Sequence, residues 1–81
     1  MAWFLYLLEC SDGSFYAGIT NRLSERITAH NNGLGARYTR GRGPVKLLAS
    51  KEYVDRSNAS KAEAVIKRLP RHKKLSFFDL P

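Results

Sequence analysis

Two apolar, aromatic segments flank a short turn near the start of the chain. Residues 3–10 and 14–20 are rich in aliphatic and aromatic side chains, and Ser11-Asp12-Gly13 lies between them. This pattern predicts a β-hairpin. A three-residue loop with Gly13 in the left-handed conformation is favoured over a two-residue turn, because it collects the apolar side chains on one face.

The predicted register divides the hairpin into two faces. Tyr6 lies opposite Gly18 and Tyr16 opposite Leu8, so both tyrosines share the second, more polar face. Because Gly18 has no side chain, we expect a notch beside Tyr6 that another group could approach. The first face offers helices an unbroken apolar surface made of Trp3, Leu5, Leu7, Phe15, Ala17 and Ile19.

Helical spacing follows the hairpin. Thr20-Asn21 supplies good N-cap residues, and Leu23 and Ile27 are spaced i, i+4, which predicts a helix over about residues 22–31. Residues 33–44 are rich in glycine and arginine and should form a loop, with at most one helical turn around residues 36–38.

A third strand and a longer helix are predicted after this loop. Residues 45–53 have β-branched and aromatic members typical of a strand, and Asp55 or Ser57 can cap a helix that extends to about residue 69. Pro70 suits the first turn of another short helix, and the C-terminal residues 75–80 should fold back onto the core. The expected buried stripe of the longer helix is Ala59, Ala62, Ile66 and Leu69.

These elements predict one α+β domain over residues 1–81, with a three-stranded, mainly antiparallel sheet flanked by helices. Fourteen Lys and Arg against seven Asp and Glu give a formal charge of +7, so polyanions are natural partners, although a basic surface that only maintains solubility has the same composition. Cys10 is the only cysteine, which excludes an intrachain disulfide. The apolar segment 3–8 is too short for a membrane span, so we expect a cytoplasmic protein without membrane association.

No zinc, serine-hydrolase or phosphate-loop motif is present. What remains is the two hairpin tyrosines, an i, i+4 pair of Arg26 and His30, and the carboxylate of Glu63. Each has a simple structural interpretation: strand aromatics, a solvated helix face, and an ion pair of Glu63 with Lys67.

Taken together, these residues resemble the GIY-YIG nuclease domain. Phe4 and Leu5 replace the first Gly-Ile of its motif and Ala17 replaces the second Ile, at positions that serve packing. The resemblance covers nearly the whole chain and is greatest to the small stand-alone bacterial members. It is carried by Leu5-Tyr6, Tyr16-Ala17-Gly18, Arg26, His30, Glu63, Asp12-Gly13-Ser14, Gly18-Ile19-Thr20, His30-Asn31, Ala36-Arg37-Tyr38-Thr39 and Asp55-Arg56-Ser57.

This resemblance implies a metal-dependent endonuclease. Glu63 would hold one Mg²⁺ or Mn²⁺ ion, Arg26 would neutralise the scissile phosphate, and Tyr6, Tyr16 and His30 would orient or deprotonate the attacking water. Which of these three takes the proton stays open. His30 is the easier base, because a phenol with a pKa of about 10 must first be depressed by Arg26 and the metal ion.

Basic residues elsewhere fit a nucleic-acid backbone, with a solvated mobile loop as the simple alternative. We expect structure-directed rather than sequence-directed recognition, DNA favoured over RNA, and a monomer that a protein partner could target. Two alternatives are a non-catalytic nucleic-acid-binding module that keeps the fold, and a domain that binds an acidic protein. The candidate contact residues are Arg37, Tyr38, Arg40 and Arg42 in the loop and Lys67, which belongs to a second basic cluster with Arg68, Arg71, Lys73 and Lys74.

Overall fold

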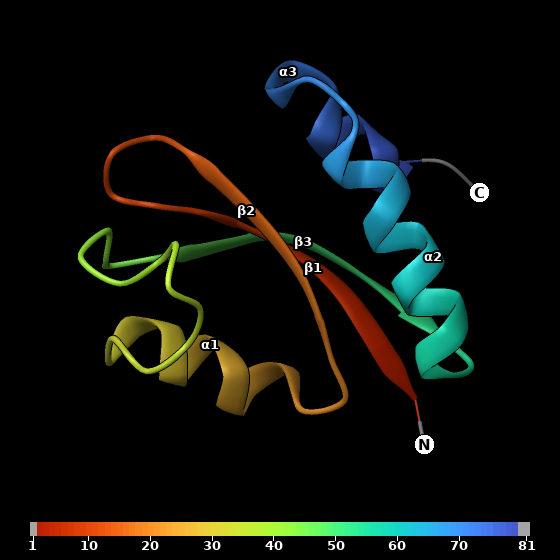
Figure 1. Ribbon diagram of the computed structural model, residues 1–81, viewed down its shortest axis with the longest axis horizontal. Helices are drawn as coiled ribbons and strands as arrows, with labels where there is room; N and C mark the ends of the chain where they lie inside the picture. The colour runs from red at the N-terminus through yellow and green to blue at the C-terminus, as the bar shows by residue number, and fades with distance from the viewer. Residues whose placement is uncertain (1, 80–81) are drawn as a thin grey trace.

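The computed structural model describes residues 2–79. A three-stranded sheet with the order β2-β1-β3 is antiparallel throughout, and α1 and α2 lie on opposite sides of it (Figure 1). The predicted α+β class and sheet are therefore confirmed. In chain order the elements are β1 (Trp3–Glu9), β2 (Phe15–Thr20), α1 (Leu23–Asn31), β3 (Lys46–Tyr53), α2 (Arg56–Lys67), α3 (Arg71–Lys74) and a short 3-10 helix (Leu75–Asp79).

The β1–β2 hairpin has the predicted register. Tyr6 pairs with Gly18 and Leu8 pairs with Tyr16, so side-chain alternation directs both tyrosines to the same face of the sheet. Gly13 has a φ of +83°, the left-handed conformation that the three-residue loop requires.

Each face of the sheet has its own apolar core. The α2 side contains the predicted apolar surface, and Phe77 and Phe78 fold back onto it. The tyrosine face is not the more polar face that the sequence predicted, because α1 covers it with Leu23 and Ile27. The buried members are Leu5, Leu7, Ala17, Ala62 and Ile66 on the α2 side, and Tyr6, Leu8, Cys10 and Val45 on the α1 side.

The start of α1 differs slightly from the prediction. Arg22 is the N-cap residue, and its side chain makes no capping hydrogen bond. The predicted cap residue Thr20 instead accepts a hydrogen bond from the Arg22 backbone N–H, at 3.0 Å. Thr20 therefore fixes the turn between β2 and α1 rather than the first turn of the helix.

The helix α2 begins as predicted. Of the two candidate caps, Asp55 is the one used, and its Oδ1 accepts from the Asn58 backbone N–H at 2.9 Å. Leu69 is partly buried beside the three buried residues of the predicted stripe. Pro70 is the N-cap of α3 rather than its first residue, and Leu80, which was expected to join the core, lies outside the described residues.

The loop between α1 and β3 contains successive turns and no helix. The backbone N–H groups of Thr39, Arg40 and Arg42 each donate to the carbonyl three residues earlier, at 3.0–3.3 Å. The end of the loop is fixed by the Val45 N–H, which donates to Asn31 Oδ1 at 2.7 Å. Within residues 2–79, no helix has the length and apolar character needed to cross a bilayer.

Candidate functional site

Tyr6 and His30 form a buried hydrogen-bonded pair. Tyr6 comes from the central strand β1, and His30 comes from the last turn of α1, the helix that covers the tyrosine face. The Tyr6 hydroxyl lies 2.9 Å from His30 Nε2, and each residue is 1% exposed. Burying two polar side chains is costly unless they bind each other, so this pair specifies how α1 sits on the sheet.

Tyr16 completes an aromatic cluster with this pair. Its ring centroid lies 6.4 Å from that of Tyr6 and 5.3 Å from that of His30, distances typical of tilted aromatic contacts. Tyr16 is half-buried, so it is the member of the cluster that reaches solvent. The predicted shared face of the two phenols is confirmed, and β2 and α1 bring Tyr16 and His30 together.

Gly18 makes room for Tyr6 rather than for an external group. A Cβ built on Gly18 would lie 2.5 Å from the Tyr6 hydroxyl oxygen and 2.8 Å from its Cζ. The predicted open notch is therefore wrong: the phenol of Tyr6 leans across its paired residue and fills that space. The glycine is needed for this close approach.

Arg26 is half-buried one helical turn before His30 and acts on both members of the pair. Burial raises the pKa of Tyr6 above its ordinary value, and Arg26 opposes this shift through hydrogen bonding and through its charge. Burial lowers the pKa of His30, and the Arg26 charge lowers it further. The pKa of Tyr6 is thus raised, whereas a role as base had been expected to require a depressed pKa.

Arg26 is accessible from solvent. It lines an open hollow of about 260 Å³ beside the start of α1, which adjoins the end of β2. A larger hollow, of about 410 Å³, lies at the start of α2 and contains none of the predicted site residues. The lining residues of the first hollow are Thr20, Asn21, Arg22, Glu25, Arg26 and Ala29.

Thr39 is a site residue that the sequence analysis did not single out. Its Oγ1 lies 2.7 Å from His30 Nδ1, and the residue is 1% exposed. Thr39 belongs to the loop between α1 and β3, nine positions after His30 in the sequence. The only signal in the sequence was its place in Ala36-Arg37-Tyr38-Thr39, one of the segments that carry the family resemblance.

Glu63 lies apart from the aromatic cluster. It is on α2, and its carboxylate pairs with Lys67 Nζ at 3.2 Å, as the simple structural interpretation predicted. Glu63 is close enough to contribute to the raised pKa of Tyr6. Within residues 2–79, however, no hydrogen bond or ion pair connects its carboxylate to the tyrosines, His30 or Arg26.

The side chains around Glu63 could give a metal ion only one protein ligand. Within the described residues, no three His, Cys, Asp or Glu side chains gather into a metal site. A divalent ion would therefore have one protein ligand, with water and substrate oxygens in the other positions. Mg²⁺ and Mn²⁺ suit such a set, because hard cations prefer oxygen ligands and Mg²⁺ usually keeps several waters. The Glu63 side chain is 23% exposed, so its carboxylate fits this role.

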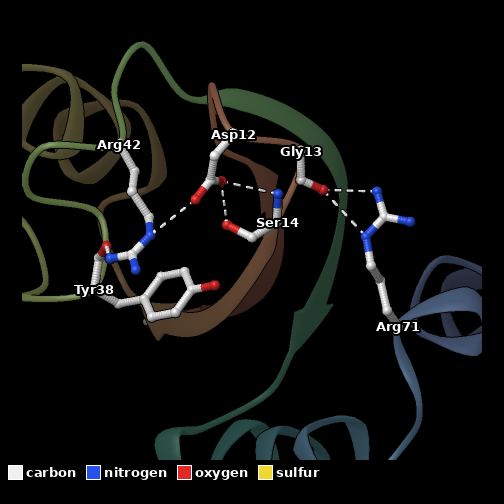
Figure 2. Close-up of polar contacts among 6 residues, drawn as sticks. All are labelled: Asp12, Gly13, Ser14, Tyr38, Arg42 and Arg71. Atoms are coloured by element: carbon white, nitrogen blue, oxygen red, sulfur yellow. Dashed lines mark hydrogen bonds and ion pairs between the residues drawn. The ribbon is translucent and has the colours of Figure 1, made fainter.

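Two of the four predicted nucleic-acid contacts in the loop, Tyr38 and Arg42, are bound within the protein. Figure 2 shows Arg42 reaching the hairpin tip, where its Nε lies 3.1 Å from Asp12 Oδ2, while its Nη1 donates to the Tyr38 carbonyl at 2.7 Å. The guanidinium also lies 4.3 Å above the Tyr38 ring, which stacks on Tyr16 at 5.9 Å. The loop is thereby fastened to the turn of the hairpin and to β2.

The other two loop arginines have no such contacts. Arg37 and Arg40 are exposed, and their side chains make no hydrogen bond or ion pair with any part of the chain that the structure describes. They are free to meet a phosphate backbone.

Some members of the second basic cluster also make hydrogen bonds within the protein. Arg71 donates two hydrogen bonds to the Gly13 carbonyl, at 3.1 and 2.7 Å (Figure 2). Its guanidinium also lies 4.1 Å above the Phe15 ring. Lys74 donates to the Ile66 carbonyl near the end of α2, at 2.8 Å. Within residues 2–79, the members whose side chains make no hydrogen bond or ion pair are Arg68 and Lys73.

Comparison with known proteins identifies the family. Residues 2–76 match the model of the GIY-YIG catalytic domain. A UPF0213 protein of Xanthomonas axonopodis pv. citri is 59% identical over 75 residues, which cover 93% of this chain and 74% of that protein. A UPF0213 protein of Clostridium perfringens is 51% identical over 72 residues, which cover 89% and 77%.

Two solved structures are also similar. The solution NMR structures of a UPF0213 protein from Bacillus halodurans and of a protein from E. faecalis align with TM-scores of 0.61 and 0.68, at 42% and 41% identity. Each alignment covers 98% of this chain and 84% of the other. The chain therefore belongs to the GIY-YIG domain family, as the sequence resemblance predicted, and its close relatives are the small bacterial UPF0213 proteins.

Proposed function

We propose that this chain is a divalent-metal-dependent endonuclease that hydrolyses phosphodiester bonds, in DNA in preference to RNA. Membership of the GIY-YIG family supports nuclease-like chemistry. The single observation that carries the proposal is the 2.9 Å hydrogen bond between Tyr6 and His30, buried beside Tyr16 and within reach of the Arg26 charge. Titratable groups perturbed by burial and by a nearby charge tend to gather at functional sites.

The role that we propose for each residue follows from how exposed its side chain is. Arg26 is half-buried and lines a hollow, so its guanidinium can pair with two oxygens of a phosphate. Tyr16 reaches solvent and is the phenol best placed to orient or deprotonate the attacking water. Tyr6 and His30 are too buried for that step and hold the geometry. A divalent ion held by Glu63 would supply positive charge to the phosphoryl and leaving oxygens.

A non-catalytic binding module is the second candidate, and the ion pair of Glu63 with Lys67 favours it. A carboxylate already neutralised at 3.2 Å gains less from binding a metal ion. Manganese separates the two candidates without an activity assay. If the site is a metal site, Mn²⁺ broadens the backbone NMR signals around Glu63, and Glu63→Gln removes this broadening.

Cleavage assays test the nuclease directly. Branched, flapped and single-stranded DNA and matched RNA are incubated with Mg²⁺, with Mn²⁺ or with chelator, and we expect metal-dependent cleavage of structured DNA. Glu63→Gln should abolish it, whereas Glu52→Gln, the same change on the exposed part of β3, should not. If Glu63→Gln cuts as fast as the parent, the metal assignment is wrong.

Binding assays test the partner. A backbone reader loses affinity steeply as salt rises, and the double variant Arg37→Gln, Arg40→Gln should weaken binding and flatten the salt dependence by about two charges. Binding without cleavage would support the binding module. The absence of DNA binding at low salt would favour an acidic protein partner. We propose a monomer whose targeting such a partner could supply, because a domain of 81 residues has little surface for reading bases.

A further inference from the structure

The side of His30 that faces away from Tyr6 is enclosed by the loop between α1 and β3. Besides Thr39 Oγ1 at 2.7 Å, the backbone N–H of Ala36 points at His30 Nδ1, with a nitrogen-to-nitrogen distance of 3.3 Å. Gly35 makes this approach possible, because a Cβ on Gly35 would overlap the imidazole at Nδ1. Its φ does not lie in the left-handed region, so this glycine serves close approach rather than backbone conformation.

These contacts distinguish the two neutral forms of the imidazole. In a neutral histidine one ring nitrogen carries the proton and the other accepts hydrogen bonds. A backbone N–H can only donate, and it cannot rotate away as a hydroxyl can. If Nδ1 of His30 carried the proton, that proton would face the Ala36 N–H and leave this donor without a partner.

The Thr39 hydroxyl agrees with an unprotonated Nδ1. Its single hydrogen has two acceptors within reach, His30 Nδ1 at 2.7 Å and the Ala36 carbonyl at 3.0 Å. A carbonyl oxygen has two lone pairs, so the Ala36 carbonyl can accept from both the Thr39 backbone N–H, at 3.2 Å, and the Thr39 hydroxyl. The Ala36 N–H decides between the two acceptors: it keeps Nδ1 unprotonated, and an unprotonated Nδ1 at 2.7 Å accepts the hydroxyl hydrogen.

We infer that Thr39 and the Ala36 backbone are positioning groups that hold His30 in its Nε2–H form, so that His30 donates its hydrogen bond to the Tyr6 oxygen. The hydrogen of the Tyr6 hydroxyl is then not used by His30.

This inference deepens the proposed function, and its consequence for hydrolysis rests on that function. His30 has no free lone pair for water: Nδ1 accepts from the loop, and Nε2 carries the proton. It is therefore a donor to Tyr6 and not the general base. The loop contributes to the site through Thr39. Because Thr39 and His30 lie on different elements, their spacing in the sequence does not predict this contact.

NMR of the imidazole nitrogens tests the form of His30 without any substrate. Two-bond proton–nitrogen correlations in mildly alkaline buffer show which ring nitrogen carries the proton, and the exposed His72 is the internal reference. We expect a protonated Nε2 and a bare Nδ1 in His30. A protonated Nδ1 would overturn the inference, whether or not the protein cuts DNA.

Variants at Thr39 test the positioning role. Thr39→Val keeps the shape of the side chain and removes the hydroxyl, whereas Thr39→Ser keeps the hydroxyl. In the Val variant, we expect the ring-nitrogen signals of His30 to be averaged between the two neutral forms. In the Ser variant, we expect them to keep the parental pattern. If the Val variant also keeps that pattern, Thr39 does not hold the imidazole. Should it fail to fold, the parent and Ser spectra still decide the protonation form.

Kinetics then separate the two proposals. Thr39→Val should lower kcat by about five- to ten-fold, roughly the value of one hydrogen bond, with KM unchanged and with rescue by Ser. A change confined to KM would show that Thr39 affects substrate binding and would overturn the positioning role. If the parent cuts nothing while His30 has the expected form, the proposed nuclease function fails and the inference about His30 stands.

Discussion

Asp12 at the tip of the hairpin pairs with Arg42 in the loop that follows α1, at 3.1 Å across thirty residues of sequence. The same carboxylate accepts hydrogen bonds from the backbone N–H and the hydroxyl of Ser14. These two bonds lower the pKa of Asp12, and the pairing with Arg42 lowers it further by a smaller amount. The Asp12 carboxylate thus stabilises the hairpin turn in which it lies. It also neutralises Arg42, one of the arginines that the sequence assigned to nucleic-acid binding.

Asp12→Asn should strengthen DNA binding. The amide oxygen can still accept from Ser14, so the turn survives while Arg42 loses its counter-ion. The formal charge rises from +7 to +8, and we expect affinity at low salt to increase by about two- to five-fold. Fluorescence anisotropy over a salt series measures this. Glu52→Gln makes the same charge change elsewhere, so an equal gain in that variant would mean that net charge, rather than release of Arg42, is responsible.

Gly18→Ala should disrupt the aromatic cluster. The added methyl would lie 2.5 Å from the Tyr6 hydroxyl oxygen, and Tyr6 is too buried to move aside freely. Overpacking of this kind costs about 1–3 kcal/mol. Gly43→Ala is the matched control, because nothing lies within 4 Å of its Cβ position and its φ is not positive. Urea denaturation measures both, and equal stability of the two variants would contradict the close approach of Tyr6 to Gly18.

The hairpin, the helices and the shared face of the tyrosines were predictable because local patterns encode them. Alternation and Gly13 determine the register, and Asp55 is a cap by residue type. The burial of the tyrosine face was not predictable from the hairpin alone, since it depends on α1 packing there. Contacts such as those of Thr39 and Arg42 also depend on how the loop folds, and neither periodicity nor residue type specifies that.

Acid should destabilise the protein through His30. Burial and Arg26 lower the pKa of His30 in the folded state, so the unfolded chain binds a proton first as the pH falls. Stability is complete above about pH 6.5, the value for an unfolded histidine, and decreases from there down to the lower pKa of the folded protein. The groups around the ring on the two strands are the phenols of Tyr6 and Tyr16. Burial raises the pKa of Tyr6, so that phenol does not titrate in this range.

Thermal unfolding across this pH window measures the effect. His30→Gln should lower stability at neutral pH, because it loses contacts of the buried ring, and it should also flatten the dependence on pH. His72→Gln, at an exposed position, is the matched control and should retain the parental dependence. A parental slope in the His30 variant would assign the acid sensitivity to another group.

Arg71→Lys should loosen the C-terminal helices without changing the charge of the protein. The Arg71 guanidinium donates to the Gly13 carbonyl through two nitrogens and lies over Phe15, and an ammonium group cannot reproduce this planar geometry. The loss should be about 1 kcal/mol, the usual net value of such a hydrogen bond. Because α3 is only four residues long, its protection from hydrogen exchange should decrease before that of α2.

The matched control is Arg68→Lys, the same substitution at an exposed arginine whose side chain makes no hydrogen bond or ion pair within residues 2–79. It should leave exchange and stability unchanged. Because both variants keep the formal charge of +7, generic electrostatic attraction to DNA is the same in each. A loss of DNA affinity in Arg71→Lys alone would therefore mean that the hairpin tip must be held by α3 for binding. Equal exchange in the two variants would show that Arg71 does not fasten α3 to the hairpin.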